Sequence, residues 1–218
     1  MIDVILFDFG GVFIESHLPP MRAAAAELGV ELDLVMQVLF GPYHEDTNHP
    51  WHRLERGEIK LDEARREISA LAAAQGMADV LDVFERMFGG AGPQAQSAVV
   101  ERTRALRAAG YRTALLTNNV AEFRPWWRGL LPLEELFELV VDSSEVGCRK
   151  PDPRFFELAL QRLGAVVPSQ CVFLDDLKSN AAAASALGMH AVVFEDQETA
   201  LAQLDALLRQ HGAPTEGS

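Results

Sequence analysis

Residues 4–12 read VILFDFGGV, and this stretch decides the fold. Its first four residues, 4–7, are all apolar and are followed at once by Asp8 and then by Gly10 and Gly11. A short apolar run that ends in turn-forming residues is typical of a strand buried on both faces. In an open parallel sheet the carboxyl ends of such strands line up along one edge, where ligands bind. We therefore expect Asp8 at a ligand-binding edge.

The same pattern returns along the chain, each time with polar residues after an apolar run. These runs are 112–116 before Thr117, 139–141 before Asp142, 171–174 before Asp175-Asp176, and 191–194 before Glu195. Helical patterns alternate with them at 97–109, 153–163 and 179–187, and a glycine stops each helix. Strands alternating with helices predict an α/β fold, a Rossmann-like parallel sheet with helices on both faces.

The region between the first strand and residue 97 is different, because no strand pattern appears there. It holds helical stretches at 21–28, 34–40, 61–74 and 80–87, then the glycine-rich segment 89–93 as a return linker. We expect a small helical cap at 15–92, placed as a lid over a catalytic core made of 1–14 and 93–212. The small, polar segment 213–218 is expected to be a disordered tail.

Composition limits the partners. The chain has 218 residues, and its formal net charge of −13 argues against nucleic acid and anionic membranes as partners. The start of the chain has no signal-peptide pattern and no apolar stretch is long enough to cross a membrane, so a cytoplasmic location is expected. Two cysteines form no disulfide pattern, and Cys148 beside Arg149 and Lys150 is either a loop residue or a thiol of lowered pKa.

The residues at the predicted strand ends suit one kind of chemistry. Asp8 and the pair Asp175-Asp176 offer the oxygen ligands that Mg²⁺ prefers. Thr117 offers a hydroxyl for phosphate oxygens, and Lys150 offers a cation to the same oxygens or to the nucleophile. An anionic substrate needs such local positive charge in an acidic protein. The set is consistent with Mg²⁺-assisted transfer of a phosphoryl group to an aspartate.

With these residues in place, the chain resembles the haloacid-dehalogenase-like (HAD) superfamily over most of its length. The matching segments are LFDFGGV at 6–12, LLTN at 115–118, GCRKPDP at 147–153 and FLDDLKSN at 173–180. The resemblance is strongest to small sugar-phosphate phosphatases and to the phosphatase domain of soluble epoxide hydrolases. The segment HRLERGEI at 52–59 is similar to that branch too, and the resemblance implies that the helical insert is a type-one cap.

The resemblance implies a nucleophile and a metal site. Asp8 would form an aspartyl-phosphate and bind Mg²⁺ through its other oxygen. The carbonyl of Gly10 and the carboxylate of Asp176 would be further ligands of the metal.

The resemblance also implies roles for the other matched residues. Thr117 and the backbone N–H of Asn118 would hold the phosphoryl oxygens. Lys150 would balance charge at the nucleophile and contact the substrate, and Asp175 would orient Lys150 or a metal-bound water. Asn180 would bind a metal-bound water or a neighbouring loop.

One position departs from the family pattern. Phosphatases of this family usually carry a second Asp two residues after the nucleophile as general acid and base, and here Gly10 stands there. Loss of such a group costs on the order of 10²–10⁴-fold in rate unless another group replaces it. Candidate replacements are Glu15, His44, Glu45, Asp46, His49 and His52. The last five also admit a zinc site, but Pro50 argues against their meeting, and a polar cap face is preferred.

The sequence thus predicts a Mg²⁺-dependent phosphomonoester hydrolase for a small phosphorylated metabolite such as a sugar phosphate. A metal-independent 2-haloacid dehalogenase could use the same Asp8, although the pair Asp175-Asp176 would then repel without a cation. The third alternative is a catalytically weakened binding or regulatory protein. The substrate and the oligomeric state are left open.

Overall fold

A parallel sheet lies at the centre of the protein, which the computed structural model describes for residues 1–16, 18–77 and 95–211. Five strands in the described chain pair in the order β3-β2-β1-β4-β5. They are β1 (Val4–Phe7), β2 (Arg112–Thr117), β3 (Leu139–Asp142), β4 (Cys171–Asp175) and β5 (His190–Val193). The five predicted strands are confirmed, and each end agrees with the prediction to within one residue.

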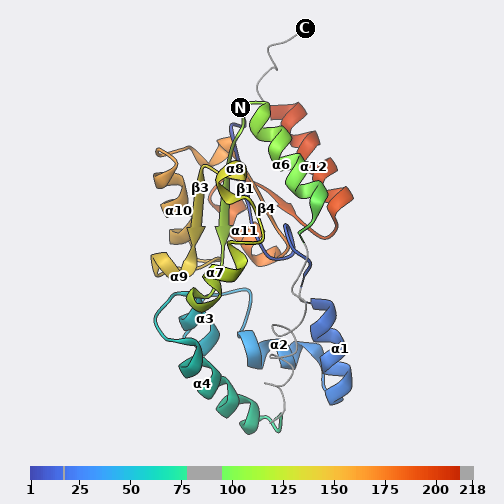
Figure 1. Cartoon of the computed structure of the whole chain (residues 1–218), viewed down its shortest axis with the longest axis vertical. Helices are drawn as coiled ribbons and strands as arrows, with labels where there is room; N and C mark the ends of the chain where they lie inside the picture. Colours follow the sequence, from blue (N-terminus) through green and yellow to red (C-terminus); the bar gives the residue numbers. More distant parts are fainter. Residues whose placement is uncertain (17, 78–94, 212–218) are drawn as a thin grey trace.

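Strand β1 is buried on both faces, and its side chains alternate between two hydrophobic clusters. Ile5 and Phe7 pack in one cluster, whereas Val4 and Leu6 pack in the other. The first cluster is completed by helices α6 (Ser97–Ala108) and α12 (Gln197–His211), and the second by α10 (Pro153–Arg162) and α11 (Lys178–Ala186). Helices therefore cover both faces of the sheet, as Figure 1 shows and as the sequence predicts.

Short helices connect the strands. They are η1 (Ala121–Phe123), α7 (Arg124–Trp127), α8 (Leu133–Leu136), α9 (Ser143–Val146) and η2 (Pro168–Gln170). No helix in the described ranges is long and apolar enough to span a lipid bilayer.

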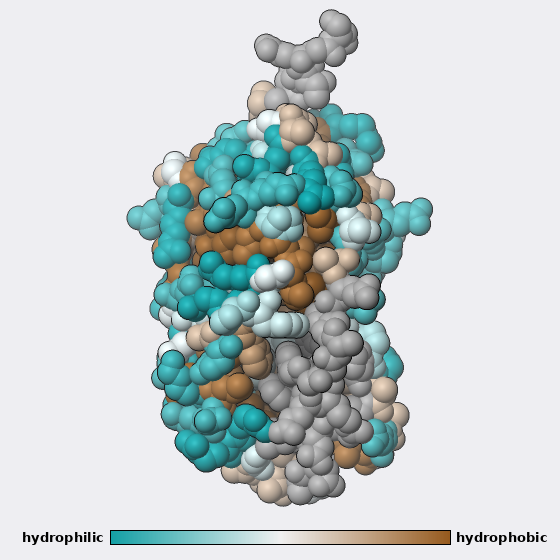
Figure 2. Space-filling model, viewed as in Figure 1, coloured by the Kyte–Doolittle hydropathy of each residue, from teal (hydrophilic) through white to brown (hydrophobic). Residues whose placement is uncertain are grey.

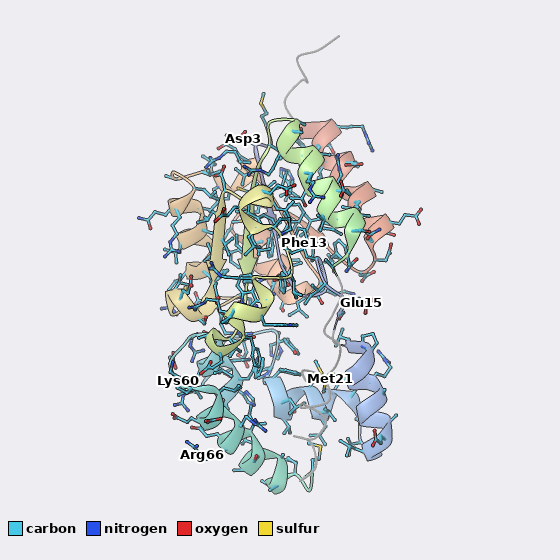
Figure 3. All side chains as sticks on the ribbon, viewed as in Figure 1. Asp3, Phe13, Glu15, Met21, Lys60 and Arg66 are labelled. Carbon is cyan, nitrogen blue, oxygen red and sulfur yellow. The ribbon has the colours of Figure 1, made fainter. Side chains whose placement is uncertain are left out.

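Between β1 and α6, four helices in the described residues gather at one end of the sheet, the lower end in Figure 1. They are α1 (Leu18–Leu28), α2 (Leu32–Phe40), α3 (Pro50–Glu55) and α4 (Leu61–Ala74). They share a hydrophobic cluster of their own, with Met21, Leu39 and Ile68 among its buried members. Figure 3 shows Met21 within this helical part and Phe13 within the sheet part. The helix predicted at 80–87, the linker predicted at 89–93 and the tail predicted at 213–218 lie outside the described residues.

Helices α3 and α12 were not predicted, and α3 corrects one expectation. Pro50 was expected to keep helix spacing from bringing the neighbouring histidines together, but it occupies the first position of α3. A proline is favourable there because that N–H has no partner within the helix. The His49 ring caps the same end, accepting a 3.2 Å hydrogen bond from the Trp51 N–H.

Candidate active site

The parallel register brings the predicted site residues together. Phe7 pairs with Leu115 of β2 and Leu174 of β4, so the residues that follow each strand meet at one edge. Asp8 continues the ladder, its N–H donating a 2.8 Å hydrogen bond to the Leu174 carbonyl. Thr117 ends β2 and Asp175 ends β4, and both side chains are buried. Residues distant in sequence therefore form one polar site in an otherwise apolar setting.

Lys150 lies at the centre of this site. Its ammonium donates hydrogen bonds of 2.6 Å to Asp8 Oδ1 and 2.7 Å to Asp175 Oδ2. Lys150 is 1% exposed, and its Nζ lies 5.3 Å from the centre of the Phe173 ring. A buried ammonium between two carboxylates is strongly held, and these two partners raise the pKa of Lys150 against the opposing effect of burial. The expected contact between Asp175 and Lys150 is therefore present.

Two asparagines hold this arrangement in place. The Asn118 side chain bridges to the backbone of Lys150: its Nδ2 donates to the Lys150 carbonyl and its Oδ1 accepts from the Lys150 N–H, each at 2.9 Å. The sequence analysis did not predict this contact of the Asn118 side chain with Lys150. Asn180 Nδ2 donates to both oxygens of Asp175, at 3.0 Å each. Lys150 and Asp175 are thus fixed by neutral donors and acceptors.

Three carboxylates crowd the edge of the sheet. Asp8, Asp175 and Asp176 can each place an oxygen within 4.8 Å of the others. Burial raises the pKa of Asp8 to about 7, although Lys150 opposes the rise. Burial and the charges of Asp8 and Asp175 raise the pKa of Asp176 to about 8. Three carboxylates face one ammonium, so the site carries excess negative charge that a divalent cation would balance, and oxygen donors of this kind fit Mg²⁺.

Two glycines after Asp8 differ in what surrounds them. Gly11 has a φ of +73°, and a Cβ placed there would lie 2.2 Å from Asp176 Oδ2. The backbone can approach Asp176 only because Gly11 has no side chain. At Gly10 a Cβ would meet no atom within 4 Å, so this position has room for a larger side chain.

The candidate replacements for the missing Asp are spread around the helical part. Glu15, labelled in Figure 3, is exposed where the chain passes from the sheet to α1. His44 and Glu45 are exposed and face each other at 3.8 Å. His52 is fully buried, and its Nδ1 lies 3.0 Å from both the Thr47 N–H and the Thr47 hydroxyl. Burial lowers the pKa of His52 to about 3, so this ring is neutral.

Neither special site that the sequence left open is present in the described residues. The sole cluster there that meets metal-ligand spacing is the one formed by the three aspartates, and no histidine joins it. Cys148 is buried, and burial raises its pKa, the reverse of the lowering that its cationic neighbours suggested. It is a loop residue without thiolate character.

A buried ion pair near the site was missed by the sequence analysis. Arg149 Nε donates a 2.6 Å hydrogen bond to Glu55 Oε2, and the two residues are 94 positions apart. No local pattern marks such a pair, since each residue taken alone looks like an ordinary surface charge. The nearest available signal was the position of Arg149 directly before Lys150.

The chain is similar in sequence to proteins of known name. The chain is 33% identical over 210 residues to acyl-CoA dehydrogenase family member 10 of Mus musculus, covering 94% of this chain but 19% of that protein. It is 28% identical over 201 residues to a phosphoglycolate phosphatase of Colwellia psychrerythraea, covering 87% and 83% of the two chains. The chain thus spans about a fifth of the mouse protein and most of the bacterial one.

Solved structures share the fold at low identity. A HAD family enzyme of Bacteroides thetaiotaomicron, in complex with magnesium and inorganic phosphate, superposes with a TM-score of 0.62 at 20% identity and covers 91% of this chain and 98% of its own. L-2-haloacid dehalogenase from Xanthobacter autotrophicus, with chloropropionic acid covalently bound, superposes with a TM-score of 0.57 at 19% identity, covering 98% and 85%. At these identities both likenesses concern the fold.

One protein-family sequence model matches residues 2–188. These residues include all four motifs, the sheet edge and the helices α1–α4. This match spans most of the chain and joins the parallel fold to the cluster around Asp8 and Lys150. The chain therefore belongs to the haloacid dehalogenase-like hydrolases.

Proposed function

We propose that the chain is a Mg²⁺-dependent phosphomonoester hydrolase that acts through an aspartyl-phosphate on a small metabolite such as a sugar phosphate. The observation that carries this proposal is the cluster of Asp8, Asp175 and Asp176 around one buried ammonium. When its carboxylates are ionised, the cluster has a negative excess that a divalent cation would balance, and a phosphate ester would add still more negative charge. The likeness to a phosphoglycolate phosphatase over most of both chains supports the same reaction class.

We assign the metal to Asp8, Asp176 and the carbonyl of Gly10. Mg²⁺ at this place would neutralise charge on the transferred phosphoryl group. Gly11 lets the backbone lie against Asp176, which helps to hold that carboxylate near Asp8. The dependence on Mg²⁺ rests on this donor set.

The chain's own residues would divide the work of hydrolysis. Asp8 attacks the phosphorus, a new P–O bond forms, and the bond from phosphorus to the leaving oxygen breaks. Water then attacks the phosphorus of the aspartyl-phosphate, which releases inorganic phosphate and restores the Asp8 carboxylate. Lys150 and Thr117, with the Asn118 N–H, would hold the phosphoryl oxygens during both steps. Gly10 has no proton to give, so we assign protonation of the leaving oxygen to water.

The helices α1–α4 would form the cap, within residues 15–92. This part of the chain contacts elements that follow the sheet edge. The Ser179 hydroxyl of α11 donates a 2.8 Å hydrogen bond to the carbonyl of Tyr43, which lies between α2 and α3. The Leu61 N–H of α4 donates to Glu122 of η1 at 3.2 Å. Val120, three residues after Thr117, is buried in the hydrophobic cluster of these helices. A segment attached to the site loops is suited to select the substrate.

Phosphate release from a panel of phosphorylated metabolites, with Mg²⁺ or with EDTA, tests the proposal. We expect release that requires Mg²⁺ and disappears in Asp8→Asn. Halide release from 2-haloacids in EDTA would instead favour the dehalogenase, which would use the same Asp8. If folded protein that binds Mg²⁺ releases neither phosphate nor halide, a binding or regulatory role would be favoured.

A further inference from the structure

A buried ion pair joins the helical part to the site. Arg149 and Glu55 are almost completely buried, with side chains 2% and 9% exposed. Arg149 Nε donates to Glu55 Oε2 at 2.6 Å, and Trp51 Nε1 donates to the other oxygen, Glu55 Oε1, at 2.8 Å. Glu55 is the last residue of α3, whereas Arg149 directly precedes Lys150 in the chain. The pair therefore connects α3 to the segment that delivers the ammonium.

A second contact joins the helical part to the segment that leads to Lys150. Gly57 follows α3 with a φ of +69°, and a Cβ on it would lie 2.5 Å from the backbone oxygen of Ser144. Ser144 belongs to α9, which begins the segment leading to Lys150. Backbone from the helical part thus rests against the start of this segment, and Glu55 holds its end.

The guanidinium of Arg149 depends on Glu55. Its Nη1 is buried and makes no hydrogen bond within the described chain. A second carboxylate, Asp46, lies 3.7 Å from that Nη1 but is engaged with Arg56. Removing one partner of a buried pair leaves the other as an uncompensated charge, and the structure must move to relieve it. Without the Glu55 charge, we expect Arg149 to turn toward Asp46 and draw the neighbouring backbone with it.

We propose that Glu55 is a positioning residue: through Arg149 it holds the Lys150 ammonium between Asp8 and Asp175. The catalytic meaning of this inference rests on the proposed function, but the placement of Lys150 can be measured independently of any activity. Asn118 fixes the backbone of Lys150 from the sheet side, and the Glu55 pair fixes it from the helical part. Loss of either anchor is expected to free the ammonium.

Lysine labelling tests the placement directly, because the sequence has three lysines. Lys60, labelled in Figure 3, is exposed beside α4, and Lys178 is 78% exposed, whereas Lys150 is 1% exposed. Reductive methylation read out by peptide mass spectrometry reports each lysine separately. In wild-type protein with Mg²⁺ we expect rapid labelling of Lys60 and Lys178 and protection of Lys150. In Glu55→Gln, which keeps an oxygen for Trp51, we expect Lys150 to react at least tenfold faster.

Glu67→Gln is the matched control. Glu67 accepts a 2.9 Å hydrogen bond from Arg53 of the same helix α3, so the variant also removes a carboxylate from an ion pair. It should leave Lys150 protected. If Glu55→Gln does not fold, Glu55→Gln/Arg149→Met replaces it, since removing both charges leaves no unpaired ion in the interior. Unchanged protection of Lys150 in the folded variant would overturn the proposal.

Kinetics give the second readout. On the best phosphomonoester found for the wild type, kcat of Glu55→Gln per folded molecule should fall about 10- to 100-fold, the cost of a misplacement near 1 Å. A merely structural role would lower the melting temperature and leave that kcat unchanged, which would contradict the proposal. A wild type that hydrolyses no phosphomonoester would refute the proposed function, and the labelling result would still decide the role of Glu55.

Discussion

Lys150 and Asp8 lie 142 residues apart in the sequence, yet the Lys150 ammonium donates a 2.6 Å hydrogen bond to Asp8 Oδ1. The same ammonium reaches Asp175 at 2.7 Å, so one cation serves two buried carboxylates. Asp176 lies beside them without a cation of its own in the described chain. This imbalance leads to the predictions that follow.

Asp8→Asn should abolish phosphate release and leave the fold intact. An amide is a poor nucleophile and a poorer metal ligand than a carboxylate. Asp205→Asn is the control, because Asp205 pairs with Arg102 at the surface, away from the sheet edge. Phosphate release and circular dichroism measure the two effects, and substantial turnover by Asp8→Asn would rule out the covalent mechanism.

Mg²⁺ should raise the melting temperature of the wild type, and Asp176→Ala should lose most of that rise. A ligand that binds the folded state at 100 times its Kd stabilises it by about 2.7 kcal/mol. Differential scanning fluorimetry across a Mg²⁺ titration gives the comparison. An unchanged Mg²⁺ response in Asp176→Ala would show that this carboxylate is not a ligand.

Gly11→Ala should destabilise the protein and weaken its response to Mg²⁺. The new Cβ would overlap Asp176 Oδ2, and the positive φ adds about 1–3 kcal/mol of backbone strain. Gly10→Ala is the matched control, because a Cβ there meets nothing within 4 Å. Chemical denaturation with and without Mg²⁺ separates the two variants, and equal stability of both would contradict the close-approach argument.

Gly10→Asp should raise turnover, by about 10- to 100-fold if proton transfer limits the wild type. A Cβ at this position meets no atom within 4 Å, and it is where relatives carry their acid–base group. Steady-state and quenched-flow rates with the same phosphomonoester measure the change. If the wild type already turns over at typical rates and Gly10→Asp is no faster, another group supplies the proton.

Stability without metal should fall as the pH rises through the neutral range. Folding raises the pKa of Asp8 to about 7 and of Asp176 to about 8, from an ordinary value of 3.8. Groups with raised pKa values stabilise the fold while protonated, so their contribution is complete below pH 4 and is lost as the pH rises toward 8. Melting temperatures in EDTA should therefore decline from pH 5 to 8.

Mg²⁺ should reverse this decline, because it binds the ionised carboxylates. The stabilisation by Mg²⁺ should accordingly grow with pH in the wild type and stay small in Asp176→Asn. A Mg²⁺ effect that is independent of pH would argue against binding at these aspartates.

The residues of the proposed site lie largely beneath the molecular surface. Figure 2 shows hydrophilic residues over much of the visible surface, with hydrophobic residues gathered mainly over the middle of the sheet part. The side chains that carry the proposed chemistry are almost all buried. We therefore expect variants at the sheet edge to change activity far more than variants at surface charges.

The sequence by itself determined the five strands and the polar residues at their ends. Val4–Phe7 is apolar throughout because β1 is buried on both faces, and the repetition of such runs, each followed by polar residues, indicated the parallel sheet. The boundaries of α4, Leu61–Ala74, follow from local helix periodicity in the same way. Helix α3 was missed because Pro50 also fits a loop, and the six-residue helix is too short to show a period.

The tertiary structure alone decided which residues support the reacting groups. The Asn118 side chain on the Lys150 backbone, the Gly11 approach to Asp176 and the Glu55–Arg149 pair join residues that share no local pattern. The sequence does not distinguish a buried charged residue from one at the surface. Only the packing of the chain shows that Glu55 and Arg149 are shielded from water. The sequence could name the reacting groups because strand ends are marked locally, whereas their supports depend on how distant segments pack.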